Sequence, residues 1–200
     1  MKFRLSKPVV LASGSPRRKE LLELAGIDFE VVKPGVDEPP IAPGEAPRDY
    51  AVRLASLKAH AVHGKAPRAA VIGSDTVVHR DGTVYGKPDG EAGARRYLNE
   101  LSGRTHLVST GVCILDGETE RSFAKDTEVV FRDIPAPLID AYVQSGDPLD
   151  KAGAYGIQSG GALFVREIRG DYHAVVGLPV ADVFAALDEM GVILTGEDEP

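Results

Sequence analysis

The sequence predicts an α/β protein in which helices flank a mixed, twisted β-sheet. Segments typical of strands and of helices alternate along most of the 200 residues, a pattern that favours strands connected through helices. Two turns, Asp81-Gly82 and Asp116-Gly117, have the dipeptide typical of tight β-hairpins. Each hairpin adds an antiparallel pair of strands, so the sheet is expected to be mixed rather than purely parallel.

The N-terminal part of the chain predicts three strands and two helices. The apolar run 8–12 lacks alternation, which is typical of a strand buried on both faces. Ser15 can cap the next helix with Pro16 at its first position, and Gly26 suits the end of that helix. The elements expected next are a strand over 29–32, a helix over 48–63 and a strand over 70–78.

The remaining part predicts hairpin strands and shorter helices. Strands are expected over 83–85, 106–115, 119–131 and 162–168, and helices over 91–101, 135–145 and 180–190. Residues 151–161 are expected to form a glycine-rich loop, which is often functional when it is long. The polar tail 195–200 is expected to be frayed. We expect one domain over residues 1–200, with two lobes around a cleft.

Composition and charge limit the partners that the protein can have. The net charge of −7 argues against nucleic-acid polymers and anionic membranes, which bind basic surfaces. Cys113 is the only cysteine, so an intrachain disulfide is excluded and a reducing compartment is favoured. No apolar run approaches the ~18 residues of a membrane span, and the one near the N-terminus is too short for a signal peptide. We therefore expect a cytoplasmic protein.

A cluster of cations opens the first predicted helix of this acidic chain. In LASGSPRRKELL, Arg17, Arg18 and Lys19 fall in the first helical turn, where the positive end of the helix dipole disfavours cations. The Ser-Gly-Ser turn before the helix also leaves backbone N–H groups that can bind an anion. The stretch predicts either a site for a small anion or a solvated basic turn.

Two charged residues interrupt segments that are otherwise apolar. Asp75 lies within the strand pattern VIGSDTVV, and an unpaired buried carboxylate is costly. Asp75 is therefore either a strand-end acceptor of backbone N–H groups, or a metal ligand or general base. Lys58 has apolar neighbours three and four positions away on its helix, so its ammonium either extends to solvent or points into a site.

Two further side chains are candidates for ligand binding. The stretch GTVYGKP lacks the spacing of a P-loop, but Lys87 at the exit of the hairpin can still contact a ligand. In GDPLDKAGAYGIQSGGALF, Gln158 carries an amide that donates and accepts. That amide complements the N3–H and O4 of uracil or thymine. The alternative is an ordinary surface amide.

Together these stretches resemble the Maf family of nucleoside triphosphate pyrophosphatases. Each segment is weak evidence alone, but the ordered set spans nearly the whole chain: LASGSPRRKELL, VDE, RLASLKA, VIGSDTVV, GKP, LSGRTHLVSTGV, GDPLDKAGAYGIQ and GDYHAVVGLP. The resemblance implies a fold similar to that of the inosine triphosphatases, with the site in a cleft between two lobes. It also implies a possible homodimer.

The resemblance further implies roles for individual residues. Asp75 corresponds to the proton acceptor of the family, and Glu38 in VDE resembles a carboxylate near the metal. Asp75 and Glu38 would thus hold a divalent cation, Mg²⁺ or Mn²⁺. Lys58 and Lys87 look like the phosphate-binding lysines, and Ser13 belongs to the phosphate-facing turn.

The positions that select the base in this family fall on Arg17, Thr76 and Gln158. This combination is similar to the branch that cleaves dTTP and UTP, whereas the branch that cleaves 7-methyl-GTP replaces the arginine and lacks the glutamine loop. One departure is Ser159, which stands where a glycine commonly follows the glutamine. The departure leaves the implied roles unchanged.

The resemblance implies hydrolysis of a nucleoside triphosphate to the monophosphate and pyrophosphate, through metal-assisted attack of water at the α-phosphorus. Two alternatives stay open at this point. The protein could bind nucleotides as a regulator of cell division and septum formation with little catalysis, or it could cleave modified nucleotides. Turnover that depends on metal would favour the enzyme over the regulator.

Overall fold

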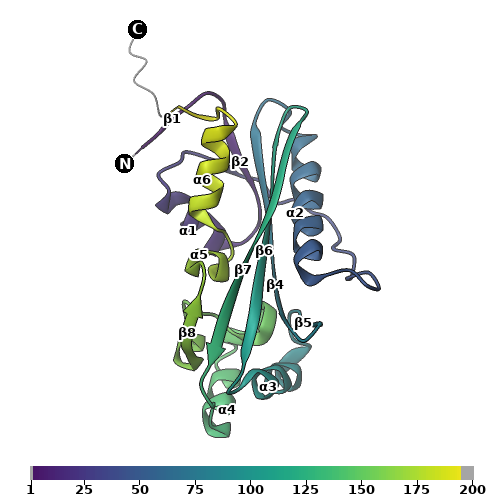
Figure 1. Cartoon of the computed structure of the whole chain (residues 1–200), viewed down its shortest axis with the longest axis vertical. Helices are drawn as coiled ribbons and strands as arrows, with labels where there is room; N and C mark the ends of the chain where they lie inside the picture. The colour runs from purple at the N-terminus through teal and green to yellow at the C-terminus, as the bar shows by residue number, and fades with distance from the viewer. Residues whose placement is uncertain (1, 195–200) are drawn as a thin grey trace.

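A seven-stranded mixed sheet forms the centre of the molecule (Figure 1). The computed structural model describes residues 2–194. The strands of this sheet are β2 (Val9–Ala12), β3 (Glu30–Val31), β4 (Ala70–Arg80), β5 (Thr83–Tyr85), β6 (Thr105–Asp116), β7 (Thr119–Phe131) and β8 (Val165–Arg169). They lie in the order β3-β2-β4-β6-β7-β8, with β5 beside β4. β2 runs parallel to β3 and β4, and the other pairs are antiparallel.

Helices cover both faces of the sheet. They are α1 (Pro16–Leu24), α2 (Pro47–His63), α3 (Gly90–Leu101), α4 (Ala136–Gln144), α5 (Tyr172–Val176) and α6 (Val180–Glu189). Figure 1 shows α2 on one face and α1, α5 and α6 on the other, with α3 and α4 at the far end of the long strands. Single 3₁₀ turns, η1 (Asp147–Asp150), η2 (Ala152–Ala154) and η3 (Gly160–Phe164), lie between α4 and β8.

The alternation of side chains along β2 explains this layering. Leu11 packs with α1 and α6 in one apolar cluster, whereas Val10 packs with α2 in another. A third cluster joins α3 and α4 to the other end of the sheet, around Phe131. The long strands β4, β6 and β7 connect the two ends, so the molecule has two lobes (Figure 1).

The structure confirms the predicted mixed sheet with flanking helices and both Asp-Gly hairpins. Ser15 and Pro16 take the predicted positions at the start of α1, but the Ser15 side chain makes no capping hydrogen bond. Instead, the Ser15 N–H donates to Ser13 Oγ at 3.1 Å. The expected tail 195–200 lies outside the described residues.

The strand expected over 162–168 was wrong in its first part, because residues 160–164 form η3 and the strand begins at Val165. Gly160 and Gly161 approach their neighbours too closely for a side chain: a Cβ on Gly161 would lie 2.6 Å from the Gly156 carbonyl oxygen. The sequence patterns also missed α5 and a short pair of strands, β1 (Arg4–Leu5) and β9 (Ile193–Leu194). These elements have two to five residues each, too few to show a period.

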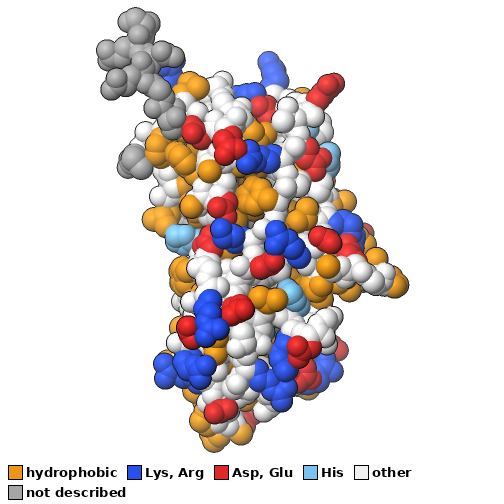
Figure 2. All heavy atoms as spheres, viewed as in Figure 1, with side chains coloured by type: hydrophobic (Ala, Val, Ile, Leu, Met, Phe, Trp, Pro, Cys, Tyr) orange, Lys and Arg blue, Asp and Glu red, His pale blue; other side chains and the backbone are white. Residues whose placement is uncertain are grey.

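Charges of both signs are mixed on the surface. In the face drawn in Figure 2, lysine and arginine side chains alternate with aspartate and glutamate rather than forming a basic stripe. Within residues 2–194, no helix has both the length and the apolar character needed to cross a membrane.

Candidate active site

A gap along one edge of β4 forms the centre of the site. β6 pairs with the other edge of β4 from Val71 to His79 without interruption. On the edge facing away from β6, β2 pairs with 70–73 and β5 pairs with 78–80. Residues 74–77 of β4 lie between these two partners, and we call this segment the sheet gap. Asp75 and Thr76 of the sheet gap line a cavity of about 870 Å³.

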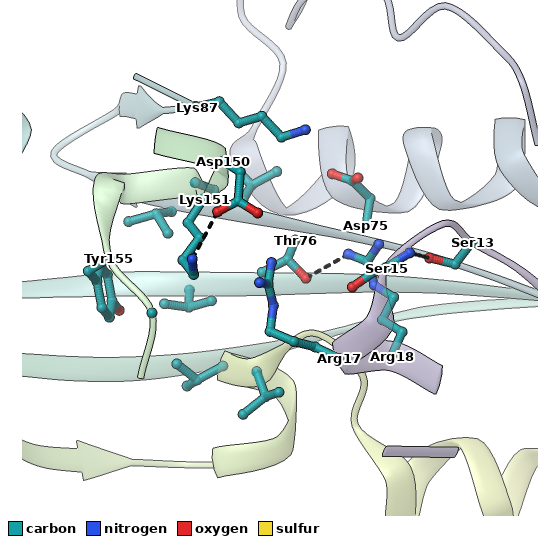
Figure 3. Close-up of a pocket in the computed structure, with 18 of the residues that line it drawn as sticks. Ser13, Ser15, Arg17, Arg18, Asp75, Thr76, Lys87, Asp150, Lys151 and Tyr155 are labelled. Carbon is teal, nitrogen blue, oxygen red and sulfur yellow. Dashed lines mark hydrogen bonds and ion pairs between the residues drawn. The ribbon is translucent and has the colours of Figure 1, made fainter. Parts of the chain in front are cut away.

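Every site residue that the sequence predicted lines this one cavity. The lining includes Ser13, Arg17, Glu38, Lys58, Asp75, Thr76, Lys87 and Gln158. They come from segments far apart in the chain. Ser13 follows β2, and Lys87 follows β5, so the two strands that border the sheet gap each deliver a residue to it. Figure 3 shows the side chains of Arg17, Asp75 and Lys87 directed toward a common space.

Asp75 is held by a buried lysine. Lys58 Nζ donates to Asp75 Oδ1 at 2.5 Å, and both residues are less than a tenth exposed, at 6% and 8%. The same ammonium lies 2.7 Å from Glu38 Oε1. Lys58 therefore points into the site, as one of the two sequence interpretations held, and it joins the two carboxylates that were predicted as metal ligands.

Close packing of α2 on the sheet brings Lys58 to this position. A Cβ on Gly73 would lie 2.2 Å from the Ala55 carbonyl oxygen, and one on Gly111 would lie 2.3 Å from the Ala51 carbonyl carbon. Gly111 is also the register partner of Asp75 on β6. The helix can lie this near to the strands only because these positions have no side chain. Sequence patterns gave no indication of this contact.

The segment that carries Glu38 is tied to the same helix. Tyr50 donates to the Pro39 carbonyl at 3.1 Å, and Arg53 donates to the Pro40 carbonyl at 3.2 Å. Arg53 also forms two hydrogen bonds of 2.7 Å with Glu45. The hydrogen bond from Arg53, with a backbone hydrogen bond, lowers the pKa of Glu45 to about 2. These contacts hold the segment that follows Glu38 against α2.

The two adjacent arginines of α1 have different surroundings. Arg17 lines the cavity, whereas Arg18 is anchored: its Nε donates to the Gly177 carbonyl at 2.8 Å and its Nη2 donates to Thr76 Oγ1 at 3.1 Å. Burial lowers the pKa of the Arg18 guanidinium, and the negative charge of Asp75 acts in the opposite direction. The sequence placed Arg18 in the basic cluster without assigning it to the site, so only the fold reveals its contact with Thr76.

The Thr76 hydroxyl belongs to a chain of hydrogen bonds with a fixed direction. Thr110 donates to the Ala174 carbonyl at 2.7 Å, which uses its only proton. Thr110 must then accept from Thr76 across 3.0 Å. Thr76 in turn accepts from Arg18. Toward a ligand, the Thr76 hydroxyl can therefore act only as an acceptor.

The loop that carries Gln158 forms the opposite wall of the cavity. The Gly153 N–H donates to the Gly86 carbonyl at 3.2 Å, which links this loop to the segment of Lys87. Gly153 has φ 71°, and a Cβ on it would lie 2.9 Å from a methyl group of Val78, so glycine suits both its conformation and its packing. Asp150 and Lys151, which sequence analysis did not assign, also line the cavity and pair at 2.8 Å (Figure 3).

The donor set of this site suits a cation shared with a ligand. Across residues 2–194, no group of three or more histidine, cysteine, aspartate or glutamate side chains is arranged to hold a metal ion. Asp75 and Glu38 are nevertheless within reach of one ammonium. Mg²⁺ is commonly bound by one or two carboxylates together with phosphate oxygens and water. These two residues fit that kind of site.

Comparison with known proteins identifies the family. A family model described as Maf-like protein matches residues 8–190. The chain belongs to the Maf family. The protein named dTTP/UTP pyrophosphatase of Bacillus cereus (strain ATCC 10987 / NRS 248) is 46% identical over 189 residues, covering 94% of this chain and 93% of the relative. The protein of the same name from Bacillus mycoides is 48% identical over 183 residues, covering 92% and 95%.

Two solved structures show a weaker similarity to this chain. The Ham1 protein of Staphylococcus aureus overlaps with a TM-score of 0.44 at 17% identity, covering 64% of this chain and 73% of that one. A nucleoside-triphosphatase, dITP/XTP pyrophosphatase, of Mycobacterium abscessus overlaps with a TM-score of 0.42 at 16% identity, covering 92% and 94%. The family model and the curated relatives confirm the predicted family, and the mixed sheet with flanking helices confirms the predicted fold class. The roles of the individual site residues stay predictions.

Proposed function

We propose that this Maf family protein hydrolyses dTTP and UTP to the nucleoside monophosphate and pyrophosphate. The observation that carries the proposal is the position of Asp75, which lies in the sheet gap within a cavity that Arg17, Lys58 and Lys87 also line. A triphosphate is the kind of ligand that several converging cations recognise. The two curated relatives bear the name of this activity.

In the proposed reaction, Asp75 accepts a proton from the attacking water. The water oxygen forms a bond to the α-phosphorus, the bond from that phosphorus to the bridging oxygen breaks, and pyrophosphate leaves with the electron pair. Lys58 keeps Asp75 in place through the 2.5 Å contact. Arg17 and Lys87 bind the phosphate oxygens, where negative charge develops during cleavage.

Asp75 and Glu38 would hold Mg²⁺ or Mn²⁺ next to the triphosphate. When bound, such an ion polarises a phosphoryl oxygen and neutralises part of the charge. The Lys58 ammonium contacts both carboxylates. It would hold Asp75 and Glu38 close together in the absence of the ion, and it would remain in contact with them when the ion is bound. The proposal also includes a cytoplasmic location and the homodimer that the family resemblance implies. Light scattering, which measures the molar mass in solution, tests the homodimer.

Base selection rests on Gln158, with Arg17 and Thr76 shaping the pocket. An amide that pairs with N3–H and O4 leaves cytosine mismatched, because cytosine has an acceptor at N3 and a donor at N4. The fixed direction of the Thr76 hydrogen bond adds a second constraint, since this hydroxyl offers only an acceptor to the nucleotide.

A panel of nucleoside triphosphates, assayed for pyrophosphate with and without Mg²⁺, tests the proposed function. We expect metal-dependent release from UTP and dTTP, and much slower release from CTP. An Asp75→Asn protein purified in the same way controls for contaminating enzymes. Tight UTP binding without turnover would instead favour the regulator, and CTP cleavage as fast as UTP cleavage would contradict the assigned role of Gln158.

A further inference from the structure

Gln158 occupies the third position of a tight turn. The Ser159 N–H donates to the Gly156 carbonyl at 3.2 Å, which closes the four residues 156–159. We call this segment the clamped turn. Ile157, the second residue, packs into the apolar clusters of both lobes. Gln158 itself is exposed and lines the cavity, so its amide has no core packing to orient it, and the backbone of the turn sets its position.

Both ends of the clamped turn are linked by hydrogen bonds to the carboxylate of Asp147, the first through Tyr142 and the last directly. At the first end, the Gly156 N–H donates to the Tyr142 hydroxyl oxygen at 3.0 Å, and that hydroxyl donates to Asp147 Oδ2 at 2.5 Å. At the last end, the Ser159 hydroxyl donates to the same Asp147 Oδ2 at 2.6 Å. The turn and these three side chains thus form a closed ring of hydrogen bonds.

Lys151 fixes the carboxylate at the centre of this ring. Its Nζ donates to the Asp147 carbonyl at 2.5 Å and to Asp147 Oδ1 at 3.0 Å. Burial acts to raise the pKa of Asp147, but the hydrogen bonds from Ser159, Tyr142 and Lys151 outweigh it and lower that pKa. Asp147 is therefore ionised at neutral pH, and an ionised carboxylate can only accept, which matches all of its partners.

The packing leaves little alternative for this arrangement. A Cβ on Gly156 would lie 2.4 Å from Ser159 Oγ, and one on Gly160 would lie 2.9 Å from the Tyr142 ring. The Tyr142 oxygen uses one lone pair and its only proton within the ring. The Tyr142 hydroxyl cannot rotate to another acceptor without breaking its bond to Asp147. The Ser159 hydroxyl lies within hydrogen-bond distance of two acceptors, Asp147 Oδ2 at 2.6 Å and the Gly156 carbonyl of the turn at 3.2 Å.

We propose that Tyr142, Asp147 and Ser159 are positioning residues that hold the Gln158 amide in register with the base and thereby determine the base preference. This inference rests on the proposed function. It adds that the preference between bases depends on hydrogen bonds among residues that do not themselves pair with the base. Asp75 and the phosphate-binding residues Arg17 and Lys87 lie on other segments, so loosening the clamped turn should change base preference more than the rate of cleavage.

Single-hydroxyl deletions test the inference. For Ser159→Ala and Tyr142→Phe, we expect the ratio of kcat/KM for UTP to that for CTP to fall on the order of fivefold to tenfold. The change should appear mainly in KM for UTP, with kcat within about twofold of the parent value, because the cleavage residues are untouched. Ser159→Thr keeps a hydroxyl and should restore most of the ratio.

Matched controls separate positioning from general damage. Ser122→Ala and Tyr172→Phe remove the same groups at exposed positions on β7 and α5, and both should keep the parent ratio. Because both hydroxyls act through Asp147, the double variant should lose less than the product of the single losses. Thermal unfolding of each variant shows whether it is folded.

The outcomes distinguish the inference from the function on which it rests. A parent protein that cleaves no triphosphate overturns the proposed function, and the same variants are then compared by equilibrium binding of UTP and CTP. Folded Ser159→Ala and Tyr142→Phe proteins that keep the parent preference, in turnover or in binding, overturn the inference. A parent protein that does not distinguish UTP from CTP also overturns it.

Discussion

The sheet gap and the clamped turn line the same cavity but are built differently. The sheet gap is part of a long central strand, and Asp75 is positioned by strand register and by the packing of α2. The clamped turn lies between 3₁₀ turns, and it is held by side-chain hydrogen bonds to Asp147. The first depends on backbone geometry and close packing, and the second depends on a few replaceable hydroxyl groups.

This difference suggests that the two regions have separate roles, one in cleavage and the other in base selection. Regular elements position groups more accurately than loops, which suits the residues assigned to cleavage. Loops tolerate change, which suits the residue assigned to base selection. Substitutions of Asp75, or of the residues that pack α2 against its strand, should therefore lower the turnover of every nucleotide alike. Substitutions around the clamped turn should instead change the preference between nucleotides.

The largest effect is expected for Asp75→Asn. Asparagine keeps the shape of the side chain but cannot accept the proton of the attacking water, so turnover of UTP and dTTP should fall on the order of 10²-fold or more. Nucleotide affinity should be largely kept, because the cations remain. Pyrophosphate release and calorimetric UTP binding measure the two quantities. Near-normal turnover would remove Asp75 from the mechanism.

A smaller effect on both stability and turnover is expected for Gly111→Ala. The new methyl group would lie 2.3 Å from the Ala51 backbone, so α2 must move and Lys58 must shift relative to Asp75. Overpacking of this kind lowers the free energy of unfolding by about 1–3 kcal/mol. Urea denaturation measures this loss, and the ratio of UTP to CTP turnover should stay unchanged.

Gly64→Ala provides the matched control for that variant. Gly64 has φ −58°, and its nearest neighbour would lie 4.0 Å from an added Cβ. The free energy of unfolding of the Gly64→Ala variant should be equal to or slightly above that of the parent protein. Equal stabilities for Gly111→Ala and Gly64→Ala would contradict the close approach of α2.

A third effect concerns pH and His106, which contacts Tyr155 in the loop that carries Gln158. His106 Nε2 lies 2.9 Å from the Tyr155 hydroxyl, and burial, with the charges of His79 and Arg80, lowers the pKa of His106 to about 3. The unfolded chain binds this proton near pH 6.5 and the folded chain does not, so acidification favours unfolding. The contribution to the free energy of unfolding should fall by about 2 kcal/mol between pH 7 and pH 5.

A His106→Phe variant isolates this contribution from that of the carboxylates. Its free energy of unfolding, measured by urea denaturation, should depend less steeply on pH in this range than that of the parent protein. Identical pH slopes for the two proteins would show that His106 is not buried in its neutral form.

Local patterns predicted the longer elements and marked two charges that interrupt apolar segments. Lys58 interrupts an apolar helical face and Asp75 interrupts a buried strand, so each could be identified from neighbours within one or two turns of chain. The resemblance to the family then united them with Ser13, Glu38 and Lys87, and the structure places all of these residues around one cavity.

Features that depend on distant contacts could not be predicted. The sheet gap exists because β2 ends at Ala12 while β5 begins to pair only at Val78, and no local signal encodes that register. Arg17 and Arg18 are adjacent and chemically equal in sequence, yet only the fold shows that Arg18 is anchored on Gly177. The ring around Asp147 joins α4, η1 and a turn, so its members could not be recognised as a unit.

The separation of cleavage from base selection is tested most directly by one comparison. It measures kcat/KM for UTP and for CTP in the Lys87→Met and Gln158→Ala variants. Lys87→Met should lower both values by the same factor, within about twofold, because it binds phosphate groups common to all nucleotides. Gln158→Ala should lower the value for UTP about tenfold more than that for CTP. A changed preference in Lys87→Met together with an unchanged one in Gln158→Ala would contradict the account.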